Sequence, residues 1–305
     1  MLSYLIKRIL YTLPSLFGIL LACFILTRLS GDPVELFLPI DASEEARQAF
    51  RVENGLDRPM VEQFFRFAER AVRGDFGVSL RFREPALDLL VERLPATLEL
   101  AFATLALSVL IGLPAGIISA YARGSPVDLA IRSITALAQA VPTFYWGILS
   151  IIIFSVWLRW LPGTGSGTIW HLILPATTLA STMLALITRV MRSTLLESIG
   201  QDYVRTARAK GLSESTVILR HAARNALIPV VTVIALQFGV LMGGVIVTET
   251  VFAWPGVGRL AIQAIYARDY PVVQAVVFFF ATIFVAANLM ADVLTVMLDP
   301  RVRLK

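Results

Sequence analysis

The stretch from Arg189 to Pro229 reads RVMRSTLLESIGQDYVRTARAKGLSESTVILRHAARNALIP. It is a long basic interruption in a chain that is otherwise rich in apolar runs of membrane-spanning length. A segment with this much charge cannot lie in hydrocarbon, so it must lie outside the bilayer. Its arginines, alanines and other helix formers predict short helices rather than a slack loop.

Within this stretch the residue pattern predicts two short helices joined at a glycine. We expect the first helix over Gln201–Ala209, with Gly211 as the left-handed residue just past its end. Ser213 suits the N-cap of a second helix that begins at Glu214, because helix N-termini favour hydroxyl caps and acidic residues. Pro229 suits the first turn of the next membrane helix. The expected structure is a helix–glycine–helix hairpin on the membrane face.

The composition places the whole chain in the membrane class. Its 305 residues are 57% hydrophobic, and the mean hydropathy is +0.74. These values predict an all-α polytopic membrane protein. The net charge of +5 lies beside membrane segments, where it indicates orientation rather than nucleic-acid binding. Cys23 is the only cysteine, so neither an intramolecular disulfide nor a cysteine metal cluster can form.

Six apolar segments are long enough to be spans. They are Ile9–Leu29, Thr97–Tyr121, Ala130–Leu158, Leu172–Ile187, Pro229–Val247 and Val272–Met297. The first exceeds the length of a signal-peptide apolar region, so we expect it to stay uncleaved. Gln139 and Pro142 interrupt the third, and the fourth is expected to continue as a helix over Arg189–Ser198. Basic residues cluster at the N-terminus, the turn after the second span, the hairpin and the tail, which places both termini and the hairpin in the cytoplasm.

No enzymatic motif is present in the sequence. There is no G-x-x-x-x-G-K-[ST] phosphate loop, so the chain does not bind ATP by that route. His171 and His221 are the only histidines, and they form no H-E-x-x-H. There is no G-x-S-x-G elbow. We therefore predict no catalytic, metal-binding or cofactor-binding residues.

Polar residues inside spans are candidates for a translocation path, because they are costly in lipid. Gln139, Gln237 and Asn288 qualify, and a hydrogen bond between helices is the alternative for each. Pro142 joins them as a kink that could serve a gate or only curvature. The G-x-x-x-G from Gly239 to Gly243 predicts a close approach between helices.

The hairpin has two possible roles. A basic segment could anchor the chain to anionic lipid, but an anchor needs charge alone. This hairpin also has Asp202-Tyr203, a placed glycine, a second helix and the small residues Thr206, Ala207 and Ala209 near its bend. Those features favour a protein-docking site.

The hairpin resembles the cytoplasmic coupling loop of ABC-importer permeases, most closely those of the dipeptide, oligopeptide and nickel class. The stretches that match are Asp202–Leu212, Arg220–Ala222 and Arg224–Pro229. Further stretches similar to that class are Leu29–Pro33, Gly74–Ser79, Leu94–Leu100, Glu249–Arg259 and Arg268–Pro271. The matches stand in order over essentially the whole chain.

This resemblance implies a type I importer permease fold of about six transmembrane helices with a long external segment after the first. The implied domains are 1–29 as first span, 30–95 as external segment, 96–300 as a five-helix permease core with coupling loop 189–228 and external loop 248–270, and 301–305 as cytoplasmic tail. Short helices such as Glu44–Arg51 and Met60–Val72 are expected in the external segment.

The resemblance also implies which residues couple the chain to an ATPase. They are Asp202, Tyr203, Arg205, Thr206, Ala207, Arg208, Ala209, Lys210, Gly211 and Leu212. Arg205-Thr206-Ala207 stands where the general family has Glu-Ala-Ala, with Gly211 in register. We therefore do not transfer the ion pair of that glutamate to this chain.

The implied assembly contains a sister permease, two ATP-binding subunits that hold ATP and Mg²⁺, and an external binding protein, in a bacterial inner membrane. Candidate contacts with the binding protein are Asp32, Asp75, Phe76, Trp254 and Arg259. The implied cargo is a short peptide, with glutathione, nickel or an opine-like solute as alternatives. The loop Leu161–His171 looks most like that of glutathione-importing relatives. A secondary transporter is the alternative of a different class, but we find neither internal repeats nor charged midplane residues.

Overall fold

The structure is a computed structural model that describes residues 2–29, 34, 38, 42–53 and 55–298. Every long element in this part of the chain is a helix, which confirms the expected all-α architecture. The chain forms two compact units. The core unit holds Ala96–Pro255 and residues 284–298. The N-terminal unit holds Leu2–Pro95 and Gly256–Ile283.

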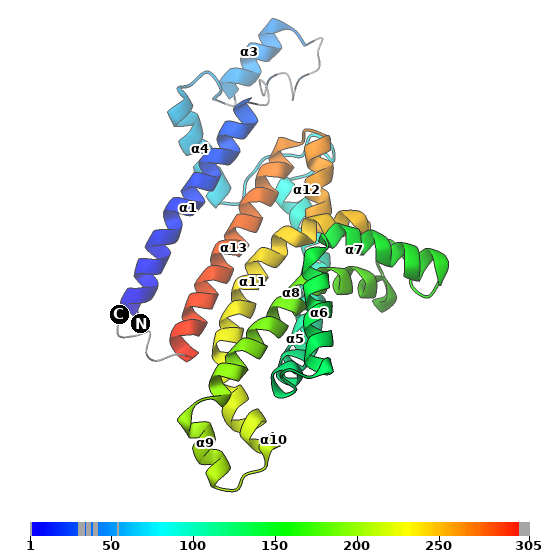
Figure 1. Ribbon diagram of the computed structural model, residues 1–305. Coiled ribbons are helices and arrows are strands. Elements are labelled where there is room, and N and C mark those ends of the chain that lie inside the picture. The colour runs from blue at the N-terminus through cyan, green and yellow to red at the C-terminus, as the bar shows by residue number, and fades with distance from the viewer. Residues whose placement is uncertain (1, 30–33, 35–37, 39–41, 54, 299–305) are drawn as a thin grey trace. The chain divides into compact units, whose positions relative to one another are not determined.

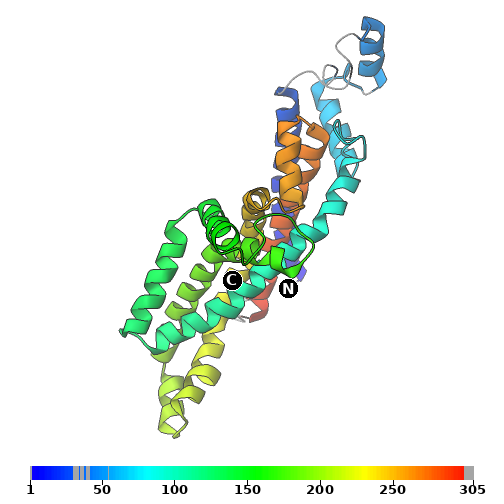
Figure 2. The same ribbon diagram turned by 90° about the vertical axis from the view of Figure 1, so that its right-hand side faces the viewer.

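The core unit is a set of long helices from which the basic hairpin extends (Figure 1). Its helices are most of α5 (Ala86–Tyr121), α6 (Pro126–Ala140), α7 (Thr143–Ser150), the π-helical η1 (Ile151–Trp157), α8 (Ile169–Ile199), α9 (Asp202–Ala209), α10 (Glu214–Thr216), the π-helical η2 (Val217–Ala222), α11 (Ala223–Val251) and the end of α13 (Tyr270–Leu298). Helix α8 packs against both α6 and α11, as Figures 1 and 2 show. This makes α8 the central helix of the unit.

Helix α5 approaches α8 closely at two glycines spaced four residues apart. A Cβ atom at Gly112 would lie 3.1 Å from the carbonyl oxygen of Leu184. One at Gly116 would lie only 2.7 Å from the carbonyl oxygen of Thr188 and from Met191 Cβ. Small residues are the usual means by which membrane helices pack this tightly.

Helix α11 makes its close contacts at Gly239 and Gly244. A Cβ at Gly239 would lie 3.0 Å from the Phe284 ring on α13, and one at Gly244 would lie 3.1 Å from Leu179 on α8. Gly243 has nothing within 4 Å of such an atom. The predicted close approach therefore occurs at Gly239, while the second glycine of the motif takes no part in it within this chain.

The predicted third span is broken rather than kinked. Helix α6 ends at Ala140, and α7 with η1 continues at an angle of 101°. Val141 is extended, with ψ 130°, and Pro142 is the N-cap of α7. A proline disfavours helical conformation in the residue before it, so the chain turns here instead of continuing.

The N-terminal unit contains α1 (Leu2–Leu29), α3 (Glu44–Glu53), α4 (Met60–Val72), the start of α5, α12 (Val257–Tyr266) and the start of α13. Aromatic residues join α1 to α4, with the rings of Phe24 and Phe64 5.6 Å apart. A second apolar cluster joins the start of α5 to α12 and α13. The two short helices expected near residues 44–51 and 60–72 are confirmed as α3 and α4.

Four described helices are long and apolar enough to span a membrane, and the bent pair of α6 with α7–η1 makes a fifth. Helix α1 has 28 residues, and Pro14–Ile25 within it is a shorter apolar stretch. These helices account for five of the six spans expected from the sequence, and α1 is a helix at the position of the first.

Candidate coupling and translocation sites

The basic hairpin is a compact helical structure. It leaves α8 through Gly200 and Gln201, forms α9, and turns over Lys210–Ser213. Gly211 has φ +76°, which confirms the predicted left-handed residue just past the helix end. Its N–H donates to the carbonyl oxygen of Arg208 at 2.9 Å, so it satisfies one of the terminal carbonyls of α9.

The return arm of the hairpin differs from the prediction. Ser213 is the N-cap of α10 in conformation, but its hydroxyl makes no capping bond and lies 2.9 Å from Thr216 Oγ1. From Glu214 the helix runs without interruption to Val251. Pro229 therefore lies inside α11 and not in its first turn, so that prediction was wrong. Local helix-start signals could not show that the hairpin helix and the membrane helix merge.

The inner face of the hairpin belongs to the apolar core of the unit. Val204 on α9 and Val217 on η2 are completely buried, and Ala207 is 6% exposed. They share one cluster with Leu195 and Met191 on α8. The hairpin is thus packed onto the membrane helices and does not hang from them as a loop.

The outer face of the hairpin is exposed and charged. All ten predicted coupling residues except Ala207 are exposed. The sequence did not identify a partner for Arg205. In the structure, Arg205 Nη1 lies 3.3 Å from Asp202 Oδ1. Arg208 donates two hydrogen bonds to Glu214 across the bend, at 3.1 and 2.6 Å, and this carboxylate raises the pKa of the Arg208 guanidinium.

A partly buried ion pair near the hairpin was missed by sequence reasoning. Arg192 on α8 donates from Nε and Nη2 to the two carboxylate oxygens of Asp128, each at 2.9 Å. Asp128 is 1% exposed and also accepts from Ser119 Oγ at 2.6 Å and from the Gly124 N–H at 3.0 Å. One carboxylate therefore ties α5, the α5–α6 turn and α6 to α8.

The sequence around Asp128 does contain a signal, but it is the local signal of a helix start. Ser125 Oγ accepts from the Asp128 N–H at 3.3 Å, and Pro126 occupies the first turn, as expected for the start of a helix. That pattern explains why α6 begins here. It does not indicate that the carboxylate of Asp128 meets Arg192, which lies 64 positions away.

The predicted path residues are placed in different surroundings. Gln139, near the end of α6, accepts a hydrogen bond from Arg189 on α8. Pro142 is exposed at the bend. Gln237 on α11 and Asn288 on α13 are both half-buried. Of these four, Gln139 is the one that the structure joins to a charged side chain.

The residues predicted to contact a binding protein also differ in their surroundings. Asp32 lies outside the described residues. Asp75 is exposed, and its carboxylate accepts from the Gly77 N–H at 3.0 Å. Phe76 is half-buried with its ring 5.7 Å from that of Phe278, and Arg259 is half-buried. Trp254 is 2% exposed, and its indole N–H donates to the Ala96 carbonyl oxygen at 2.8 Å, so its side chain has almost no free surface to offer a partner.

The stretches that resembled the importer class pair with one another in space. In the core unit, Thr97 donates to the completely buried Glu249 at 2.7 Å, beside the Trp254–Ala96 bond. In the N-terminal unit, the buried Asp269 accepts from Ser79 Oγ and from the Leu80 N–H at 3.1 Å. These motifs therefore hold together segments that are far apart in the sequence.

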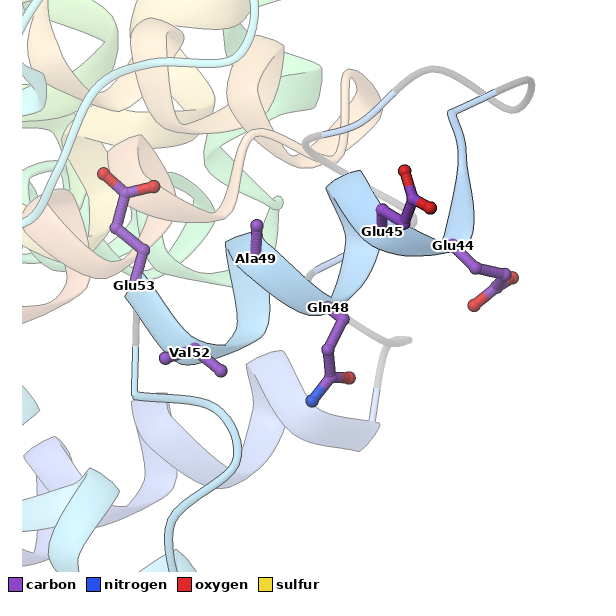
Figure 3. A pocket seen from close by; sticks show the side chains of 6 residues that line it. All are labelled: Glu44, Glu45, Gln48, Ala49, Val52 and Glu53. Atoms are coloured by element: carbon purple, nitrogen blue, oxygen red, sulfur yellow. The ribbon is translucent and has the colours of Figure 1, made fainter.

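The described residues provide no group of His, Cys, Asp and Glu side chains suited to hold a metal ion. A shallow surface hollow lies along α3 and is lined by that helix alone, by Glu44, Glu45, Gln48, Ala49, Val52 and Glu53. Figure 3 shows Gln48 and Val52 on the opposite side of α3 from Ala49 and Glu53, so these side chains do not converge on one ligand.

Comparison with known proteins shows the family. Residues 112–304 match the binding-protein-dependent transport system inner membrane components. The glutathione transport system permease protein GsiC of Escherichia coli K12 is 42% identical over 306 residues, covering 100% of both chains. The protein of the same name from Shigella flexneri serotype 5b is 41% identical with the same coverage. The chain belongs to this family of permeases.

Solved structures show the same fold. The inward-facing MetNI methionine ABC transporter has a TM-score of 0.59 at 21% identity, covering 69% of this chain and 96% of that one. An amino acid ABC transporter crystallised with histidines has a TM-score of 0.52 at 17% identity, covering 70% and 94%. The chain is thus the permease subunit of an ABC importer, an inner-membrane transport component rather than an enzyme, which works with other transporter subunits.

Proposed function

We propose that this permease imports glutathione or similarly short peptides in an ATP-driven complex. The observation that supports this substrate is the 42% identity to the glutathione permease GsiC over the full length of both chains. Glutathione is itself a tripeptide, so the proposal narrows the peptide class expected from the sequence. Nickel and opine-like solutes become the weaker candidates.

The proposed complex pairs this chain with a sister permease to form one pore. Two ATP-binding subunits lie at the hairpin side and hold ATP and Mg²⁺, while an external binding protein delivers the substrate. Both termini and the hairpin lie in the cytoplasm, in keeping with the basic residues at these positions.

The packing of the hairpin supports a role in coupling. Its outer face, with Tyr203 39% and Leu212 40% exposed, docks into a groove of an ATP-binding subunit. Its inner face is buried against α8, and its return arm is continuous with α11. Movement of the ATP-binding subunits therefore passes to two membrane helices as a rigid-body rotation between inward- and outward-facing states.

Uptake into membrane vesicles tests the proposal. The four kinds of subunit are co-expressed, and uptake of labelled glutathione is measured with and without ATP in the presence of the binding protein. We expect ATP-dependent, saturable uptake that unlabelled short peptides inhibit and Ni²⁺ does not. Uptake driven by an ion gradient without ATP, or transport of Ni²⁺ in place of glutathione, would contradict it.

A further inference from the structure

Two arginines one helical turn apart on α8 have opposite surroundings. Arg192 is paired through both of its donor positions with the buried Asp128. Arg189 is exposed and donates to the side-chain oxygen of Gln139, which is neutral. Among the described residues, no carboxylate lies within ion-pair distance of Arg189, whereas Arg192 forms an ion pair with Asp128 at 2.9 Å.

The Arg189 side chain reaches away from the hairpin end of the unit. Asp128 and Gln139 are 11 residues apart on α6, or about 16 Å along its axis, while Arg192 and Arg189 are only about 4.5 Å apart on α8. Because the two helices are antiparallel, Arg189 lies on the side of Arg192 farther from the hairpin and extends further in that direction.

The face of α8 that bears Arg189 is largely polar. Thr182, Leu186, Arg189 and Ser193 follow the spacing of one helix face, and none of them is buried. The other faces of α8 are largely covered by the unit itself. Since an unpaired charge is costly against lipid, this uncovered face must border water or another polar surface.

We infer that Arg189, oriented by Gln139, binds a carboxylate of the substrate on the translocation path. The planar guanidinium matches a carboxylate through two parallel hydrogen bonds. The Gln139 amide can orient the guanidinium but leaves its positive charge uncompensated. The ligand class is a carboxylate-bearing peptide such as glutathione, so the inference rests on the proposed function.

The test compares a free acid with its amide. Uptake of glutathione and of glutathione amidated at its glycine carboxylate is measured for the wild-type complex and for Arg189→Gln, and the same is done with alanyl-alanine and its C-terminal amide. Selection by the binding protein cancels in the ratio of wild type to variant, because that protein is unchanged. We expect Arg189→Gln to lower the uptake efficiency of a free acid about tenfold more than that of its amide.

Two further variants separate charge from structure. Arg123→Gln removes an exposed charge from the α5–α6 turn and should affect acid and amide equally. Gln139→Leu leaves Arg189 in place without its orienting partner and should reduce the preference for the acid. The Gln139→Leu variant also tests the inference if the complex that carries Arg189→Gln fails to assemble.

The outcomes separate the inference from the proposed function. Equal losses on acid and amide for both Arg189→Gln and Gln139→Leu would overturn the inference and would point to an acidic group of another subunit as the partner of Arg189. A wild-type complex that transports neither glutathione nor alanyl-alanine would overturn the proposed function and the inference together.

Discussion

Gly211 isolates the effect of backbone conformation in the hairpin. Its φ is +76°, and a Cβ atom at this position would meet nothing within 4 Å. An added Cβ therefore meets no neighbouring group, and the main cost of a substitution is the left-handed conformation, about 1–2 kcal/mol for an L-residue.

We predict that Gly211→Val lowers substrate uptake and substrate-stimulated ATP hydrolysis while membrane insertion stays normal. Gly211→Asn is the matched variant, because asparagine tolerates the left-handed region, and it should retain most of the uptake. Equal loss in both variants would show that the small size of the residue matters instead. Normal uptake by Gly211→Val would count against a coupling role for the bend.

The Asp128–Arg192 pair gives a prediction about stability. Removing Arg192 leaves the buried Asp128 carboxylate without compensation, whereas removing both charges leaves neutral groups. Arg192→Gln should therefore lower the melting temperature of the purified complex more than the double variant Asp128→Asn/Arg192→Gln does. A double variant that melts lower than either single variant would exclude this explanation.

At the scale of elements, the α5–α8 contact depends on the absence of a side chain at Gly116. A Cβ there would lie 2.7 Å from backbone and side-chain atoms of α8, so the helices would have to separate. We predict that Gly116→Ala destabilises the protein by about 1–3 kcal/mol, the usual cost of overpacking. The measurement is the thermal midpoint in detergent.

Gly243→Ala is the matched control for that substitution. Gly243 also lies in an apolar membrane helix, but no described residue comes within 4 Å of the added atom. The isolated subunit should therefore melt at or slightly above the wild-type temperature, because alanine is the better helix former. A loss seen only in the assembled complex would locate a subunit contact at Gly243.

The hairpin should be held by its apolar packing more than by its surface ion pair. The Arg208 and Glu214 side chains are 41% and 43% exposed, and such pairs contribute at most about 1 kcal/mol. Val204 is completely buried, so Val204→Ala opens a cavity between the hairpin and α8.

We therefore predict that Val204→Ala lowers uptake per ATP hydrolysed, while Glu214→Gln leaves this ratio near the wild-type value. Both quantities come from the same vesicle preparation. A larger loss in Glu214→Gln than in Val204→Ala would assign the rigidity of the hairpin to the ion pair.

At the scale of the whole molecule, the two ends of the core unit should face opposite sides of the membrane. Ser166, in the loop before α8, and Lys210, in the hairpin, are both exposed. Cys23 is the only cysteine and is buried, so its replacement by serine provides a cysteine-free background. In right-side-out vesicles, a membrane-impermeant thiol reagent should label Ser166→Cys and not Lys210→Cys. The reverse labelling would invert the proposed orientation.

Most of the hairpin was predictable because its signals are local. Gly211 was identified as a left-handed cap from the helix formers before it, and α9 begins within one residue of its expected start. Pro229 was misplaced because a proline is compatible both with a first turn and with a long membrane helix in which other groups compensate for the lost bond.

The sequence by itself determined the class, the apolar spans, the charge asymmetry and the capped hairpin, because each depends on residues that are neighbours in the chain. Only the tertiary structure decided that Asp128 meets Arg192, that Ser79 meets Asp269 from 190 positions away, and that Gly116 rather than Gly243 lies at a helix crossing. The tertiary structure alone also decided the 101° break after α6. The physical reason is that each depends on which helix faces meet, and hydrophobic periodicity alone cannot assign partners when most faces of the membrane helices are apolar.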